Sequence, residues 1–79
     1  MVDAPMRDDP EHPARWLTVA DCRYTSPCRA TRCARVATLV LRKSEANGRP
    51  LGQIELCHTH ASVVVMREQA RGLGITDRR

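Results

Sequence analysis

The sequence Cys57-His58-Thr59-His60 follows an apolar run and precedes a segment with the composition of a helix. Cys57 and His60 are three residues apart, so in the first turn of a helix their side chains point in the same direction. A Zn²⁺ ion prefers four nitrogen and sulfur ligands in a tetrahedron, and a Cys-x-x-His helical turn supplies two of them. We therefore expect a zinc site at this turn, with its other two ligands earlier in the chain.

Three further cysteines precede this turn, and two of them are needed to complete the site. Their spacing is Cys22-x5-Cys28-x4-Cys33, and 23 residues then separate Cys33 from Cys57. We predict that one structural Zn²⁺ ion is bound by Cys28, Cys33, Cys57 and His60, because Cys28 and Cys33 lie nearest the following strand. Cys22 paired with either Cys28 or Cys33 stays open as the alternative first pair.

The composition indicates that the fold needs such a cross-link. The chain has 79 residues, no Phe, and only Trp16 and Tyr24 as aromatic residues. Domains of this size gain only about 3–5 kcal/mol from burial and usually need a disulfide or a metal. The acidic, proline-rich start contains no signal sequence, so we expect a cytoplasmic location, where thiols stay reduced and free to bind metal. No apolar run is long enough to span a membrane, and we expect no membrane association.

Two segments between the cysteines and the helix have the pattern of a β-hairpin. Residues 35–42 and 51–56 are rich in β-forming side chains, and Asn47-Gly48 between them is a strong hairpin-turn signal. A helix is then expected from His58 to about Arg71. Its apolar positions would pack on the hairpin.

The composition changes at both ends of this region. The N-terminal residues are acidic, rich in proline and poor in apolar side chains, so they cannot offset the entropy cost of ordering. Trp16 starts a short β-prone run over residues 16–19. Its indole could be a surface platform for a base or a partner, but we expect it to cover the small core. The predicted division is a flexible tail (1–15), a zinc-finger domain (16–73) and a flexible C-terminal end (74–79).

The order of cysteine loop, hairpin and helix resembles the treble-clef class of zinc fingers over residues 20–71. The stretches 28–37 and 48–61 are similar to short zinc-finger proteins of actinobacteria and their phages, in which a cysteine pair precedes a strand and Cys-x-x-His-Ala opens a helix. The resemblance implies a small α+β zinc finger built from a cysteine loop, or knuckle, a β-hairpin and a C-terminal helix. The usual knuckle has two residues between its cysteines, whereas this chain has four or five.

The charge favours an anionic partner, although the same arginines would also serve solubility. The net charge is +4, and the basic residues gather near the cysteine loop and the hairpin. We predict a nucleic-acid-binding or regulatory module; the scarcity of aromatic residues argues against single-strand recognition. The candidate nucleic-acid-binding residues are Arg23, Arg29, Arg32, Arg35, Arg42, Lys43 and Arg49.

A protein-interaction adaptor is the alternative function. The apolar run Val63–Met66 is broad enough to face both a thin core and a partner, including a second copy of the chain. We expect no enzyme activity and no small-molecule substrate, because four protein ligands leave the zinc no open position and no acid–base motif lies nearby.

Overall fold

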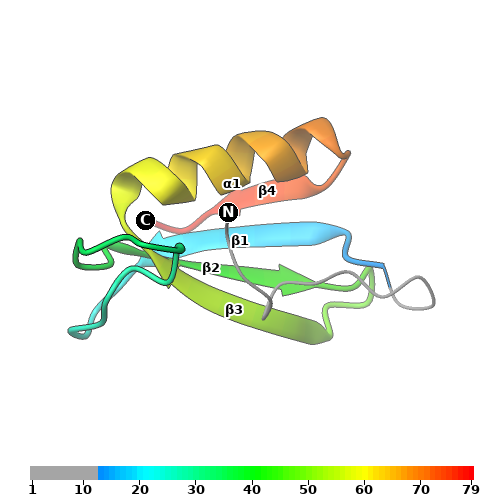
Figure 1. Cartoon of the computed structure of the whole chain (residues 1–79). Helices are drawn as coiled ribbons and strands as arrows, with labels where there is room; N and C mark the ends of the chain where they lie inside the picture. The colour runs from blue at the N-terminus through cyan, green and yellow to red at the C-terminus, as the bar shows by residue number, and fades with distance from the viewer. Residues whose placement is uncertain (1–12) are drawn as a thin grey trace.

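Within residues 13–79, which the computed structural model of the chain describes, four strands form one sheet in the order β3-β2-β1-β4. One helix lies across one face of this sheet, and the described residues place no helix on the opposite face (Figure 1). This is a small α+β fold. Its elements are β1 (Trp16–Asp21), β2 (Leu39–Ser44), β3 (Pro50–Leu56), α1 (His58–Ala70) and β4 (Gly74–Asp77).

The strands β2 and β3 pair in antiparallel orientation and confirm the predicted hairpin. Gly48 in the connecting turn has a φ of 90°, a conformation that residues with a side chain rarely adopt. β2 begins at Leu39, later than the predicted strand over residues 35–42. The reason is that the residues before β2 belong to the cysteine loop, where the Ala37 N–H donates to the Ser26 carbonyl at 2.8 Å.

The strand β1 lies in the interior of the sheet, antiparallel to β2 and parallel to β4. The β-prone run predicted at residues 16–19 is therefore part of a complete strand. Side chains alternate between the two faces, so Leu17 and Val19 are buried on the side of the helix. Trp16 lies on the other side and is 45% exposed, so the prediction that it covers the core is wrong.

The C-terminal residues also differ from the prediction, which made 74–79 a flexible end. α1 ends in a Schellman turn: the Gly72 N–H donates to the Gln69 carbonyl at 3.0 Å and the Leu73 N–H to the Glu68 carbonyl at 3.1 Å. Gly72 has the positive φ, 95°, that this turn requires. The turn reverses the chain and buries Leu73, so β4 returns alongside β1 as an additional strand.

The ordered fold begins slightly before its predicted start at residue 16. Ala14 is 6% exposed and belongs to the core. The Arg15 N–H donates to the Ser44 carbonyl at 2.8 Å, and the Arg15 carbonyl accepts from the Gly74 N–H at 2.9 Å. Arg15 is therefore hydrogen-bonded to the sheet and Ala14 packs in the core, while residues 1–12 of the predicted tail lie outside the described residues.

The core lies between α1 and the sheet. The predicted helix is confirmed, and its buried residues are Ala61, Val64 and Glu68. Most of the facing side chains of the sheet are large and apolar. They are Leu17, Val19, Leu39, Leu41, Ile54 and Leu56.

A buried ion pair joins the sheet to the second half of the helix. Lys43 Nζ lies 3.2 Å from Glu68 Oε1, and both side chains are 3% exposed. The prediction that Lys43 contacts nucleic acid is therefore wrong. Lys43 alternates with Leu39 and Leu41 on the inner face of β2, which places it under α1 rather than on the surface.

We expect Lys43→Met to destabilise the protein by about 3 kcal/mol, because removing one partner leaves the other as an uncompensated buried charge. The expected loss is at the lower end of the usual range because Arg71 also lies 3.3 Å from Glu68. Adding Glu68→Leu to Lys43→Met should recover most of the stability, since an apolar pair fills the same space without a charge. Urea unfolding followed by circular dichroism measures both effects. A loss below about 0.5 kcal/mol for the single variant would mean that the pair behaves like an exposed one.

Candidate metal centre

The cysteine loop between β1 and β2 folds back on itself. Pro27 and Val36 form an isolated antiparallel bridge, and the Cys28 N–H donates to the Arg35 carbonyl at 2.9 Å. At the tip of the loop, Arg32 has a φ of 62°, and the Cys33 N–H donates to the Ala30 carbonyl at 3.2 Å. These bonds place Cys28 and Cys33 on opposite arms of one short loop.

The first turn of α1 supplies the other side of the site. Cys57 is the N-cap residue of the helix, in an extended conformation, and its carbonyl accepts from the Ala61 N–H at 2.9 Å. Its thiol lies 3.2 Å from the Nδ1 atom of His60. The Cys-x-x-His spacing therefore brings both side chains to the same side of the helix, as the sequence predicts.

The donor atoms of these two segments lie close together. Cys33 Sγ lies 3.9 Å from Cys57 Sγ, and Cys28 Sγ lies 3.6 Å from His60 Nδ1. A tetrahedral ion with bonds of about 2.3 Å to sulfur and 2.0 Å to nitrogen separates two sulfurs by about 3.8 Å and sulfur from nitrogen by about 3.5 Å. Among the described residues, this Cys₃His cluster is the one group of potential ligands whose donor atoms all lie close together, within 4.8 Å. Its geometry and chemistry fit one metal ion.

The electrostatics of the cluster also favour a bound cation. Burial opposes ionisation of Cys57, but the backbone N–H of His60 and the side chains of His60, Cys28 and Cys33 together lower the pKa of Cys57 to about 6. Burial raises the pKa of the Cys28 thiol above its ordinary value. One thiolate is therefore stabilised by its neighbours, while a second costs free energy unless a cation is present.

Cys22 does not join the cluster. Its thiol donates to the Tyr24 carbonyl at 3.2 Å, and its backbone N–H donates to the Thr38 carbonyl. Cys22 therefore lies at the start of the loop, where β1 ends. The structure brings the predicted pair, Cys28 and Cys33, to the helix turn, and not either of the alternative pairs with Cys22.

The arginines of the cysteine loop lie on the surface around this cluster. Arg23, Arg29, Arg32 and Arg35 are all exposed. Arg29 lies 3.6 Å from Glu55 on β3, and Arg35 donates to Thr59 on α1 at 3.1 Å. Among the described residues, Arg23 and Arg32 have no side-chain hydrogen bond or ion pair, so their guanidinium groups are available to another molecule.

The remaining candidates are more distant from the metal centre. Arg42 is exposed on the outer face of the sheet and donates to Gln53 at 3.0 Å. Arg49 follows the hairpin turn and lies 3.8 Å from Glu45. The seven predicted nucleic-acid-binding residues thus divide into four around the loop, two elsewhere on the surface, and the buried Lys43.

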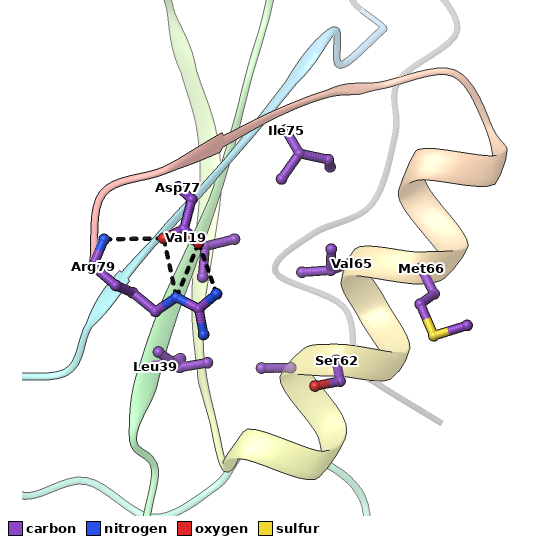
Figure 2. A pocket seen from close by; sticks show the side chains of 9 residues that line it. Val19, Leu39, Ser62, Val65, Met66, Ile75, Asp77 and Arg79 are labelled. Atoms are coloured by element: carbon purple, nitrogen blue, oxygen red, sulfur yellow. Dashed lines mark hydrogen bonds and ion pairs between the residues drawn. The ribbon is translucent and has the colours of Figure 1, made fainter.

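A hollow of about 250 Å³ lies between α1 and the edge of the sheet (Figure 2). Its wall is mostly apolar, with contributions from Val65 and Ile75. The ion pair of Asp77 and Arg79 lies beside it, and hydrogen bonds from Arg79 lower the pKa of Asp77 to about 2. Sequence patterns do not indicate this hollow, because its lining comes from several elements that are distant in the chain.

Comparison with known protein families, characterised proteins and solved structures finds no match for this chain. In the part of the chain that the structure describes, no helix is long and apolar enough to cross a membrane. The site is therefore interpreted from its own geometry and chemistry.

Loss of any one of the four clustered donors should weaken zinc binding at least about 100-fold, beyond the 10–100-fold typical of residues that only support a ligand. The test variants are Cys28→Ser, Cys33→Ser, Cys57→Ser and His60→Ala. Cys22→Ser is the matched control and should keep one zinc ion per chain at unchanged affinity. Native mass spectrometry gives the metal count, and competition with a chromophoric chelator gives the affinity. Zinc loss in the Cys22→Ser variant would contradict the assignment.

Proposed function

We propose that the chain is a zinc-stabilised domain of treble-clef-like arrangement, in which Zn²⁺ links the cysteine loop to the first turn of α1. Three sulfurs and one imidazole nitrogen form a soft ligand set that favours Zn²⁺ over Mg²⁺ or Ca²⁺. Four protein ligands complete the tetrahedron and leave no position for a substrate or an activated water. We therefore assign the zinc a structural role rather than a catalytic one.

The small core supports this proposal. The fully buried large side chains are few: Leu17, Leu41, Ile54, Leu56 and Val64 in the described residues. A structural zinc ion contributes about 10–16 kcal/mol in finger peptides, far more than such a core supplies. Binding of the metal and folding of the domain are then one process.

We further propose that this domain binds nucleic acid through the arginines of the cysteine loop. The observation that carries the proposal is the position of Arg23, Arg29, Arg32 and Arg35, all exposed on or beside one loop. Residues 13–79 hold twelve Lys and Arg against five Asp and Glu, a balance of +7, which becomes +6 when three thiolates and Zn²⁺ are included. An excess of positive charge gathered beside one loop matches a phosphate backbone.

A protein-interaction adaptor is the second candidate. Val63 and Met66 are 52% and 70% exposed on α1, and Met66 also borders the hollow beside β4. Exposed apolar side chains of this kind favour contact with a protein or with a second copy of the chain. Sedimentation analysis separates the two candidates, because a helix-mediated dimer would dissociate on Met66→Ser whereas nucleic-acid binding would not change.

Chelation of zinc with EDTA should unfold residues 20–71, because the core alone cannot offset the entropy cost of ordering this segment. Circular dichroism at the helical wavelength should fall to the level of an unfolded chain and recover when zinc is added back. The Cys22→Ser variant serves as the control and should respond in the same way. A helical signal that persists in EDTA would refute the structural role of the metal.

Replacing Arg23 and Arg32 by glutamine should make binding to duplex DNA less dependent on salt. The log–log slope should decrease by about 0.9 for each phosphate that the variant no longer neutralises. The matched control is Arg67→Gln, which removes an exposed arginine from α1, away from the loop. Fluorescence anisotropy of a labelled duplex at several salt concentrations measures the slope. Equal slopes for the wild type and the double variant would refute the proposal, as would absence of binding to both duplex and single-stranded DNA at low salt.

A further inference from the structure

The outer face of the sheet presents the only tryptophan of the chain. Within residues 13–79, α1 covers one face of the sheet and no helix covers the other (Figure 1). Trp16 and Thr18 alternate with the buried Leu17 and Val19, so their side chains lie on this outer face. Trp16 is 45% exposed, which is a large exposed apolar surface for a chain with so few aromatic residues.

The indole of Trp16 packs over Gly74. The two residues are partners in the parallel pairing of β1 with β4. A Cβ atom on Gly74 would overlap the six-membered ring of Trp16, so the ring packs directly against the backbone of β4. The missing side chain at position 74 therefore creates the space that the ring occupies, and the indole is positioned before any ligand binds.

The charge around Trp16 is complementary to a phosphate group. Arg42 lies opposite Thr18 in the β1–β2 register, which places it one strand across and two residues along from Trp16. The outer positions of β1, β2 and β4 carry no acidic residue. The one outer acid of β3, Glu55, accepts from the Tyr24 hydroxyl and lies 3.6 Å from Arg29. An aromatic ring beside an arginine is the combination that binds an unpaired base and its phosphate.

The outer face also leads to the arginines of the cysteine loop. β1 runs from Trp16 to Asp21, and the loop follows directly. At about 3.3 Å per residue, the two ends of β1 are about 17 Å apart, with Arg42 between them. A single nucleic-acid strand of a few nucleotides can therefore contact Trp16, Arg42 and the loop arginines together.

We propose that the outer face of the sheet binds single-stranded nucleic acid, with one base stacked on Trp16 and a neighbouring phosphate at Arg42. This inference rests on the nucleic-acid function proposed above and specifies its substrate as single-stranded. Bases in a duplex are stacked on one another and offer no free face to Trp16, whereas bases of a single strand do. The scarcity of aromatic residues argues against single-strand recognition, but for this function the position of Trp16 matters more than the number of aromatic residues.

The test uses the full zinc-loaded chain and an oligothymidylate of about twelve nucleotides, a length within the known range of single-strand sites. Since Trp16 is the only tryptophan, intrinsic fluorescence reports directly on stacking. We expect quenching that saturates at the same oligonucleotide concentration as the anisotropy of a labelled copy. Trp16→Leu should weaken binding about tenfold, whereas Trp16→Phe, which keeps an aromatic ring, should weaken it about threefold or less. Arg42→Gln should lower the single-strand salt slope by about 0.7.

The outcomes separate this inference from the function on which it rests. If the oligonucleotide binds while the fluorescence of Trp16 and the affinity of Trp16→Leu stay unchanged, the inference is overturned and binding by the loop arginines stands. If a duplex binds more tightly than the oligothymidylate and the fluorescence of Trp16 does not change, the inference is likewise overturned and binding by the loop arginines stands. If neither single-stranded nor duplex DNA binds at low salt, the proposed function and this inference are both overturned. Circular dichroism of each variant shows whether a loss of binding reflects a loss of fold, and the paired Leu and Phe variants keep the test decisive.

Discussion

The fold depends on the convergence of the cysteine loop and the first turn of α1. Three sulfurs and one imidazole nitrogen lie within 4.8 Å of one another, and two of the sulfurs belong to buried residues. Ionised sulfurs at such separations repel one another, so a cation is required for all three to be thiolates at once. The loop also contacts the rest of the fold through the Arg29 N–H, which donates to the Glu55 carbonyl at 3.0 Å, and through Ala30, which is buried in the core. The loop is therefore positioned by this cluster together with its contacts to β3 and the core.

The other end of α1 is held by a different interaction. Lys43 and Glu68 form a buried pair between β2 and the helix, and the Schellman turn at Gly72 then directs the chain into β4. α1 is thus fixed near its start by the Cys₃His cluster and near its end by the ion pair and the turn. A helix held at two points covers one face of the sheet, and within residues 13–79 no helix covers the opposite face (Figure 1).

Local patterns in the sequence predict the parts of this structure that depend on neighbouring residues. The Cys-x-x-His turn, the Asn47-Gly48 hairpin and the extent of α1 each follow from short-range spacing and turn chemistry. β4 does not, because a run of four residues shows no clear alternation and becomes a strand only beside β1. The buried pair of Lys43 and Glu68 becomes predictable when the two residues are considered together. Each is a charged residue at a position where the periodicity predicts burial, and opposite charges at such positions indicate a buried pair.

The metal centre and the basic surface are connected through the loop. With three thiolates and the proposed Zn²⁺ ion, the site would carry a net charge of −1, so it would repel phosphate and the arginines would have to supply the attraction. Arg35 donates to Thr59 on α1, and Arg29 lies near Glu55 on β3. These interactions connect Arg29 to β3 and Arg35 to α1. In the proposed function, the zinc would act on a nucleic acid without touching it, by keeping the loop and its arginines docked at the end of the strand that carries Trp16.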